Sequence, residues 1–435
     1  MAVTADRFAS ALVDRGLDET EREAKRVLSR AVLDRHAHVR GEAPDHVWWV
    51  PGRLEVFGKH TDYAGGRTLV CPVPRGFAVA ASRRADGVVR AIDAGRGQDV
   101  VVGPPKAGTP AGWGRYVEVA VRRLQRNFPA AAFGADIVFA SDVPSACGMS
   151  SSSALVVAVA TALARIAGLQ DHPAWRAAIR DDLDAAAYFA CIENGASFRE
   201  LDGNPGVGTH GGSEDHTAIL AGRPGYVSAF RFVPPSPLGS AAVPGDWRFA
   251  IAPSGVAARK IGAAQAPYNR LSAATRLLID AWNRSEPRAA SLGAALCSGE
   301  SARSRLLALA EAAATPEASA TWLRDRLEHF IREDGRVLPA LEAFAHADAA
   351  ALTALAESSQ RDAETLLRNQ VPASSALARS ARSLGAFAAC SFGAGFGGAV
   401  WALVPASSTT RFVAAWQPGA FLMTPGPPLT DLSGV

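Results

Sequence analysis

The chain has 435 residues, of which 48% are hydrophobic and 20% charged, with 45 Lys and Arg against 42 Asp and Glu. At about 100–200 residues per domain, this length predicts two or three domains, and the apolar content suffices for a large core, which excludes global disorder. A formal net charge of +3 is too balanced for a protein that coats nucleic acid or binds a membrane surface.

Sequence signals for membrane insertion, secretion and zinc binding are weak. The longest apolar run, residues 154–164, is shorter than the about 20 residues that a spanning helix needs, and the first residues lack the pattern of a secretion signal. The five cysteines are widely spaced and form no CxxC pair or Cys/His cluster. We therefore expect free thiols in the cytoplasm, with no membrane partner and no nucleic-acid partner.

Hydrophobic spacing predicts a helical arm over residues 5–38 and then a strand at Val47-Trp48-Trp49-Val50. Proline and glycine at residues 234–239 predict a connection between two halves of the chain. The other predicted elements are strands near 68–73, 76–82, 135–140, 247–252 and 399–404, helices over 117–124, 150–167 and up to about 385, and a glycine-rich loop over 202–213.

A polar cluster follows the first strand. Residues 51–66 read Pro-Gly-Arg-Leu-Glu-Val-Phe-Gly-Lys-His-Thr-Asp-Tyr-Ala-Gly-Gly. Composition alone allows a solvated hairpin, but loops that follow a hydrophobic strand commonly carry binding groups on a rigid support. We favour a binding loop.

Residues 144–155 place four serines, Ser150 to Ser153, directly before an apolar helix. A helix start offers free N–H groups and a positive dipole end to an anion, and small residues let a phosphate approach the backbone. A simple helix cap needs one serine rather than four, so we favour a phosphate-binding loop. The segment is not a Walker A loop, because none of the four lysines completes that pattern.

Gly393–Gly398 satisfies the GxGxxG pattern of dinucleotide-binding proteins. A strand-like stretch follows it instead of a helix, and fewer than forty residues remain. We therefore predict a tight turn that supports a neighbouring site.

In this order, the three motifs resemble the galactokinase branch of the GHMP sugar and metabolite kinases. The resemblance covers most of the chain and includes the segments 113–117, 254–256, 268–269 and 326–330. It implies an α+β fold with two GHMP domains, residues 1–235 and 236–435, and an active site in the cleft between them. It also implies transfer of the γ-phosphoryl group of ATP, with Mg²⁺, to the anomeric hydroxyl of a sugar, galactose by default, by a monomer.

The resemblance assigns roles to residues. Asp215 is the expected catalytic carboxylate, although alone it reads as a loop acid or helix cap, and Arg53 is its expected cationic partner. Ser152 and Glu193 are expected to hold Mg²⁺, an ion that prefers oxygen ligands. The expected sugar contacts are Lys59, His60, Asp62, the backbone of Gly212 and Tyr268, and the expected phosphate contacts are Cys147, Gly148, Met149, Ser150, Ser151, Ser152 and Ser153.

The chain departs from the family pattern mainly at the sugar end. Lys59 stands where an acid that binds the C6 hydroxyl is usual, Glu55 replaces an Asn, and Glu214 replaces a Met. Ala146 replaces a common Gly, and residues 196–205 are an insertion of about ten residues. The parts expected to move the phosphoryl group are retained, so a kinase is a firmer prediction than galactose as its substrate.

Two alternatives to a galactose kinase stay open. A lysine at position 59 attracts an anion, which favours a uronic acid such as galacturonate, unless Glu55 or Glu214 neutralises it or it points towards a phosphate. A catalytically silent sugar sensor is the other alternative, although the serine run, Glu193 and Asp215 are all present. A kinase of an isoprenoid alcohol or an amino acid fits residues 60–63 less well.

Overall fold

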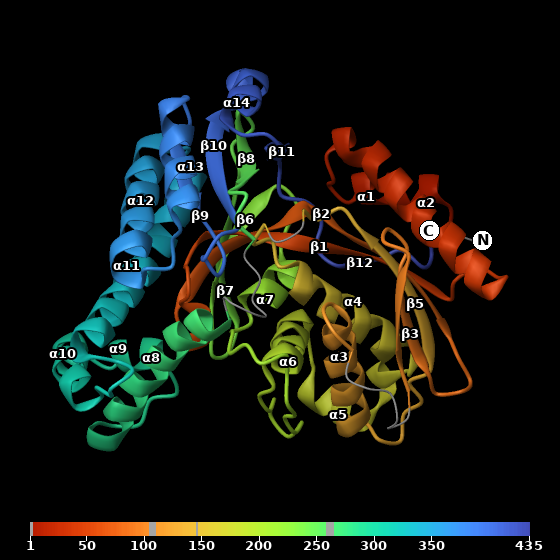
Figure 1. The fold of residues 1–435 in the computed structure, drawn as a ribbon, viewed down its shortest axis with the longest axis horizontal. Coiled ribbons are helices and arrows are strands. Elements are labelled where there is room, and N and C mark those ends of the chain that lie inside the picture. The colour runs from red at the N-terminus through yellow and green to blue at the C-terminus, as the bar shows by residue number, and fades with distance from the viewer. Residues whose placement is uncertain (1–2, 104–109, 145–146, 258–264) are drawn as a thin grey trace.

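The computed structural model describes residues 3–103, 110–144, 147–257 and 265–435 and contains an eight-stranded and a four-stranded sheet, each covered by helices (Figure 1). The first part of the chain forms, in order, α1 (Ala5–Asp14), η1 (Glu19–Glu21), α2 (Arg22–Arg40), β1 (His46–Phe57), η2 (Asp62–Ala64), β2 (Arg67–Arg83), β3 (Val89–Asp93), β4 (Gln98–Val102), α3 (Gly114–Asn127), β5 (Ala135–Ser141), α4 (Ser151–Ile166), η3 (Leu169–Asp171), α5 (Pro173–Ala178), α6 (Asp182–Asn194), α7 (Glu214–Ala221), β6 (Tyr226–Arg231) and β7 (Ser236–Ala242).

The second part forms β8 (Trp247–Pro253), α8 (Gln265–Ser285), α9 (Leu292–Leu296), α10 (Ala302–Ala312), α11 (Ala320–Ala345), α12 (Ala349–Asp362), the π-helical turn η4 (Ala363–Leu367), α13 (Pro372–Ser383), β9 (Ala388–Ser391), β10 (Ala399–Pro405), η5 (Ala406–Ser408), α14 (Thr409–Trp416), β11 (Phe421–Met423) and β12 (Thr430–Asp431). This mixture of helices and sheets confirms the α+β prediction. Within the described residues, no helix is both long enough and apolar enough to cross a bilayer.

The larger sheet has the strand order β12-β1-β2-β5-β3-β4, with β6 added to β2 and β7 to β6. It is buried on both faces, which explains the unbroken apolar run in β1. Val47 and Trp49 pack under α1 and α2, whereas Trp48 and Val50 face the core that α3 and α4 cover. Figure 1 shows these two pairs of helices on opposite sides of the sheet.

The smaller sheet has the order β11-β8-β10-β9. Along β10, Val400 packs with α13 and α14, while Trp401 faces α11 and α12. Trp401 also meets Phe57 of β1, with ring centroids 5.8 Å apart. A continuous apolar core therefore joins the two sheets.

Two details of the strand prediction differ from the structure. The strands expected at 68–73 and 76–82 form one 17-residue strand, β2, which pairs with β6 near its start and with β5 near its end. Residues 234–239, expected to connect two halves, lie in the β6–β7 hairpin, so the larger sheet extends beyond residue 235. The chain also returns to this sheet at its other end, because β12 pairs with β1.

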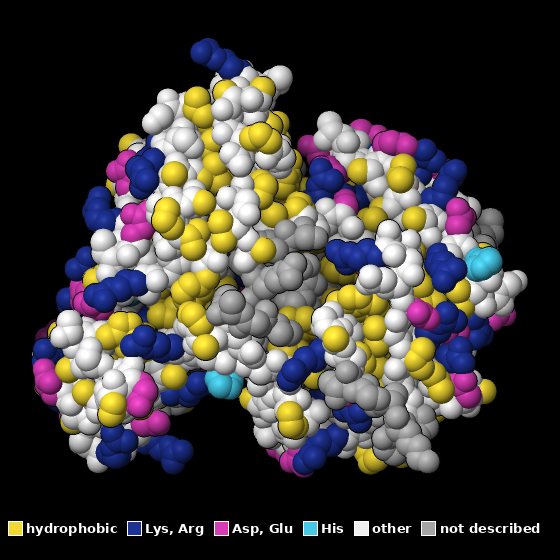
Figure 2. Space-filling view, viewed as in Figure 1, with side chains coloured by type: hydrophobic (Ala, Val, Ile, Leu, Met, Phe, Trp, Pro, Cys, Tyr) yellow, Lys and Arg dark blue, Asp and Glu magenta, His cyan; other side chains and the backbone are white. Residues whose placement is uncertain are grey.

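Basic and acidic side chains are interspersed over the face of the molecule shown in Figure 2 and do not gather in one patch of a single sign. Among the described residues, basic and acidic side chains also form ion pairs with one another, such as Arg303 with Glu328 and Arg305 with Glu286. Positive and negative side chains are thus mixed on this face, as they are in the composition of the whole chain.

Candidate active site

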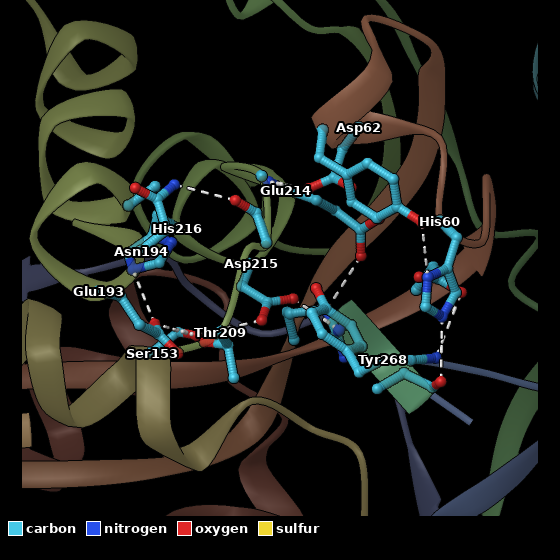
Figure 3. Close-up of a pocket in the computed structure, with 18 residues that line it drawn as sticks. His60, Asp62, Ser153, Glu193, Asn194, Thr209, Glu214, Asp215, His216 and Tyr268 are labelled. Atoms are coloured by element: carbon cyan, nitrogen blue, oxygen red, sulfur yellow. Dashed lines mark hydrogen bonds and ion pairs between the residues drawn. The ribbon is translucent and has the colours of Figure 1, made fainter. Parts of the chain in front are cut away.

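A polar pocket lies where the expected catalytic and sugar-binding segments meet (Figure 3). β1 and the loop that follows it form one wall, while the start of α7, the end of α6 and Tyr268 of α8 form the others. The cavity volume is about 40 Å³. The lining residues are Arg53, Glu55, His60, Asp62, Tyr63, Ser153, Ala190, Glu193, Asn194, Thr209, Gly211, Gly212, Glu214, Asp215, His216, Tyr268, Gly393 and Ala394.

Arg53 and Asp215 form the central ion pair of this pocket. Arg53 Nη2 lies 2.6 Å from Asp215 Oδ1, and Arg53 Nη1 donates to the carbonyl oxygen of Gly148 in the serine-rich loop. Burial opposes the charge of Arg53, but Asp215, Glu214 and Glu55 more than offset it and hold the pKa of Arg53 above its ordinary value. The guanidinium is therefore a fixed cation between the predicted catalytic acid and the predicted phosphate loop.

Ser153 joins two acids of the pocket. Its Oγ lies 2.8 Å from Glu193 Oε2 and 3.1 Å from Asp215 Oδ2, and the single hydroxyl proton can serve only one of them at a time. His216 Nε2 lies 3.3 Å from the same oxygen of Glu193. These oxygen atoms suit a hard cation such as Mg²⁺.

The described residues contain no group of three or more His, Cys, Asp or Glu arranged to hold a metal ion. A divalent cation here would therefore need water or substrate oxygens besides Glu193 and a serine. The serine beside Glu193 is Ser153 rather than the expected Ser152, which lines a neighbouring cavity. Successive residues of a helix point about 100° apart, so a shift of one residue changes the cavity that a side chain faces.

The expected sugar contacts His60, Asp62, Gly212 and Tyr268 all line the pocket. His60 Nε2 lies 3.0 Å from the carbonyl oxygen of Ala394, which can only accept, so this nitrogen carries the proton. Asp62 Oδ2 accepts from the backbone N–H of Glu214 at 3.1 Å. A Cβ on Gly212 would lie 2.3 Å from the same Asp62 oxygen, so only glycine fits there.

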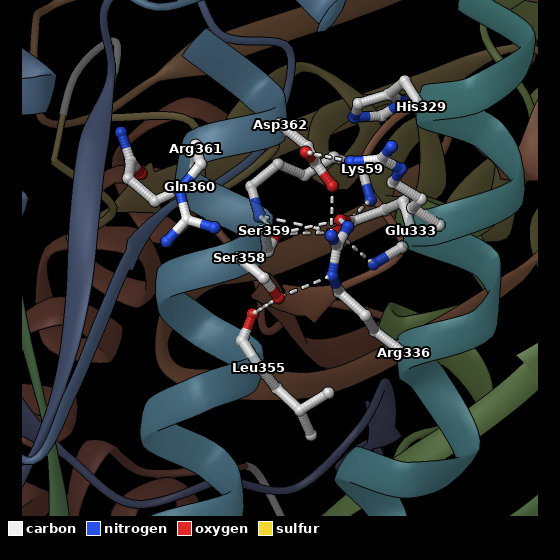
Figure 4. Close-up of polar contacts among 12 residues, drawn as sticks. Lys59, His329, Glu333, Arg336, Leu355, Ser358, Ser359, Gln360, Arg361 and Asp362 are labelled. Atoms are coloured by element: carbon white, nitrogen blue, oxygen red, sulfur yellow. Dashed lines mark hydrogen bonds and ion pairs between the residues drawn. The ribbon is translucent and has the colours of Figure 1, made fainter. Parts of the chain in front are cut away.

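Lys59 differs from the expectation, because it does not reach the pocket (Figure 4). Its side chain is fully buried, and its Nζ lies 2.8 Å from Ser359 Oγ, 3.2 Å from Cys390 Sγ and 3.6 Å from Glu333 Oε1. Lys59 is thus neutralised internally: Glu333 of α11 is its ion-pair partner, and the charge of Glu55 also favours its ammonium form. In this structure the ammonium group lies outside the lining of the pocket.

A second cavity of about 610 Å³ adjoins the first, and Ala394 lines both. Cys147, Gly148, Met149, Ser150, Ser151 and Ser152 form one wall, and the aromatic rings of Phe77, Trp113, Tyr116 and Phe139 form part of the rest. The described part of the predicted phosphate loop excludes Ser145 and Ala146.

Ser150 precedes α4 in the left-handed region, at φ 55°, and its buried Oγ has no hydrogen-bond partner in the structure. A strained backbone and an orphaned hydroxyl at the start of a helix suit an anion that accepts hydrogen bonds. The cavity therefore offers a helix start that suits phosphates and aromatic rings that suit a base.

The glycine-rich segment before β10 forms the predicted supporting turn. Gly393, Gly395, Gly397 and Gly398 all have positive φ, and so does Phe396. The N–H of Gly393 donates to Glu55 Oε1 at 3.2 Å, and the adjacent Ala394 carbonyl holds His60. The turn thus supports the first pocket, as predicted.

Sequence reasoning did not assign several residues that support the pocket. Arg326 of α11 donates to the carbonyl of His60 and to Tyr63 Oη, and Asn194 Nδ2 donates to the carbonyl of Gly211 at 2.9 Å. Arg326 belongs to a segment that carries the family resemblance, and this resemblance was the only sequence feature that pointed to a role for it. Its partners are more than 260 residues away, so sequence spacing could not reveal them.

Comparison with known proteins gives three family matches in chain order: the galactokinase galactose-binding signature over residues 34–83, the GHMP kinases N terminal domain over 115–187 and the GHMP kinases C terminal over 340–418. Among curated relatives, the galactokinase of Actinobacillus pleuropneumoniae serotype 5b is 36% identical over 113 residues, which are 26% of this chain and 29% of the relative. The galactokinase of Streptomyces coelicolor is 36% identical over 135 residues, 30% of this chain and 35% of the relative. These alignments span only about a third of each relative.

Solved structures share the fold over almost the whole chain. Lactococcus lactis galactokinase complexed with galactose has a TM-score of 0.71 at 20% identity and covers 92% of this chain and 99% of its own. A D-glycero-D-manno-heptose 1-phosphate kinase from Bacteriodes thetaiotaomicron has a TM-score of 0.55 at 12% identity, over 88% of this chain and 98% of its own. At these identities the likeness concerns the fold alone.

Proposed function

The chain belongs to the GHMP kinases, and from this premise we propose that it transfers the γ-phosphoryl group of ATP to the anomeric hydroxyl of a monosaccharide, galactose by default. The observation that carries the proposal is the Arg53–Asp215 ion pair in the first cavity, because Arg53 also donates to the carbonyl of Gly148, a residue that lines the second cavity. One cavity is polar and sugar-facing, and the other suits a nucleotide. The pair therefore stands where an acceptor hydroxyl and a terminal phosphate would meet.

Arg53 would neutralise the charge that develops on the transferred phosphoryl group, because it is buried and permanently charged. Asp215 would orient the acceptor hydroxyl and take its proton. A carboxylate paired with a cation is a weak base, but a loose phosphoryl-transfer transition state needs little early proton removal. His60, Asp62 and Tyr268 would hold the remaining hydroxyls of the sugar.

Glu193, with Ser153 beside it, would hold Mg²⁺. When bound, this ion would supply positive charge that offsets the charge of the phosphates. The N-terminus of α4 and Ser150 would bind the phosphates, and Arg53 would keep the loop carbonyl of Gly148 in place.

The two alternatives receive no support from the geometry. The argument for a uronic acid depended on Lys59, whose ammonium group contacts Glu333 outside the pocket. The argument for a silent sensor needs a damaged site, whereas Arg53, Glu193 and Asp215 are all in the pocket. All five cysteines are free, which supports a reducing compartment, and we propose cytoplasmic action as a monomer.

The test is an ADP-release assay with purified protein, ATP, Mg²⁺ and a panel of hexoses and uronic acids. We expect turnover with galactose, and phosphorus NMR should show a phosphate on the anomeric carbon. Turnover with galacturonate alone, or sugar binding without any ADP release, would overturn the proposal in favour of one of the two alternatives.

A further inference from the structure

Two buried carboxyl groups line the polar pocket and, beyond their charge beside Arg53, have no role in the phosphoryl transfer described above. Glu55 comes from β1 and Glu214 from the start of α7, and each is only 3% exposed. Glu55 Oε1 accepts from the N–H of Gly393 at 3.2 Å. Glu214 Oε1 lies 3.2 Å from Arg53 Nε, but the geometry is not that of a hydrogen bond, and this oxygen has no hydrogen-bond partner in the structure.

Acids dominate the charge of this pocket. Among the described residues that line the pocket, Arg53 is the only Lys or Arg, and Asp215 already holds it at 2.6 Å. The lining carboxyl groups are Glu55, Asp62, Glu193, Glu214 and Asp215. Even when Glu55 and Glu214 share one proton, the carboxylates outnumber this cation.

Ionising both of these buried glutamates at once has a high free-energy cost, because burial and the repulsion between like charges oppose the second charge. Burial and the neighbouring charge of Glu55 raise the pKa of Glu214 well above its usual range, and burial raises the pKa of Glu55 as well. When one of the two carboxyl groups is protonated, the pair offers both a hydrogen-bond donor and negatively charged acceptors. Such a pair can donate a hydrogen bond to a hydroxyl group or accept one from it, and it attracts an ammonium group.

We propose that Glu55 and Glu214 form a specificity-determining pair that selects the sugar by charge, accepting neutral and amino sugars and rejecting sugars that carry a carboxylate. The inference rests on the proposed sugar kinase function and adds the substrate class. An ammonium group would meet described lining residues whose carboxyl groups outnumber their one guanidinium, whereas a carboxylate would add one more negative charge to that excess. The pair would thus disfavour binding of a uronic acid, the substrate class that a lysine at position 59 suggested from the sequence.

A purely structural role for Glu214, as a second partner of Arg53, is the competing explanation. Loss of that role would lower turnover by the same factor for every sugar, because Arg53 acts on the phosphoryl group. A specificity role changes the ratio between sugars of different charge. The ratio therefore separates the two explanations.

The experiment compares galactose, 2-amino-2-deoxygalactose and galacturonate at about pH 6.5, where amines of this kind are protonated. It uses wild type, Glu214→Met and Glu55→Asn, which restore the residues usual in the family, and Glu214→Gln, which removes the charge at constant size. Glu311→Gln, an exposed acid paired with Arg324 far from the pocket, is the matched control. Both kcat/KM and the dissociation constant of each sugar without ATP are measured.

We expect the amino sugar to be preferred to galacturonate in wild type, and Glu214→Met to reduce that preference about 10- to 150-fold, the range for a hydrogen bond to a charged group. Glu311→Gln should leave the preference unchanged. The inference is overturned if all three pocket variants keep the wild-type ratio while galactose is still phosphorylated. If one variant does not fold, the other two carry the same comparison.

The proposed function and the inference fail in different ways. If wild type phosphorylates no sugar of the panel, the proposed function is wrong, and the dissociation constants still show whether the pair selects by charge. If galactose is phosphorylated but galacturonate binds as well as the amino sugar, only the inference is wrong.

Discussion

Replacing Glu333 by Gln should weaken the attachment of the predicted sugar-binding loop to α11. Glu333 is fully buried, and its Oε1 accepts from the N–H groups of Gly58 and Lys59 at 3.1 and 3.3 Å. It is also the carboxylate within ion-pair distance of Lys59 Nζ among the described residues. Glutamine keeps one acceptor for the backbone but leaves the buried ammonium of Lys59 without a counter-charge.

The size of the expected stability loss follows from the burial of the Lys59–Glu333 ion pair. Removing one partner of a buried ion pair costs about 3–5 kcal/mol, because the other charge stays buried and uncompensated. Arg336, 2.7 Å from Glu333 Oε2, keeps Asp362 as a second partner, so the cost falls mainly on Lys59. A loss of this size is a large fraction of the about 5–15 kcal/mol by which a domain is stable.

Guanidinium unfolding curves and hydrogen exchange at the Gly58 and Lys59 amides measure the effect. The denaturation midpoint should fall, and exchange at both amides should accelerate. Glu333→Gln combined with Lys59→Met removes both charges and should recover part of the loss. The reasoning is refuted if Glu333→Gln keeps the wild-type midpoint and protection, or if the double variant is less stable by the sum of the single losses.

The same pair predicts a pH dependence. Burial alone would raise the pKa of Glu333, but Lys59, Arg336 and the Gly58 N–H lower it below its ordinary value. A carboxyl group with a depressed folded-state pKa contributes stability above its unfolded pKa of about 4.3, and that contribution is lost as the pH falls further. Glu333→Gln should therefore flatten the acid side of the stability profile.

Four other outcomes test the site. Asp215→Asn should keep ATP binding by calorimetry and lose turnover by about 10²- to 10⁴-fold, and a near wild-type rate would contradict its role as proton acceptor. Glu193→Gln should raise the Mg²⁺ concentration for half-maximal activity more than the KM for sugar, whereas an unchanged Mg²⁺ titration would remove it from the metal site. In unfolding curves, the stability of Glu214→Met relative to wild type should increase as the pH rises from about 5 to 7. The reason is that a carboxyl group with a raised folded-state pKa lowers the free energy of unfolding by up to about 1.4 kcal/mol for each pH unit above its unfolded pKa. A stability difference between the two proteins that stays constant over this pH range would contradict the prediction. Lys59→Glu should lower the thermal midpoint, because it places a second carboxyl group beside Glu333. It should not change the ratio of galactose turnover to galacturonate turnover. A changed ratio would show that residue 59 takes part in sugar selection.

Features that depend on neighbouring residues were predictable from the sequence. The strand at Val47–Val50 is apolar at every position because helices cover both faces of its sheet. The serine run begins a helix, and the glycines of Gly393–Gly398 form a turn with positive φ. These patterns work because backbone hydrogen bonding, capping and glycine's freedom are decided within a few residues.

Side-chain direction was decided by the tertiary structure. Lys59 lies between Gly58 and His60, both with positive φ, and it points away from the pocket that its neighbour His60 lines. The residues that receive it, Glu333, Ser359 and Cys390, come from segments more than 270 residues later. No local pattern specifies such partners.

The sequence by itself therefore determined the family, the order of the motifs and the set of residue types that meet in the pocket. Only the tertiary structure decided that Ser153 rather than Ser152 contacts Glu193, and that residues 234–239 close a hairpin. The physical reason is the same in both cases. Local propensity selects helix, strand or turn, but the face that a residue presents, and the charge that it meets there, depend on packing against distant parts of the chain.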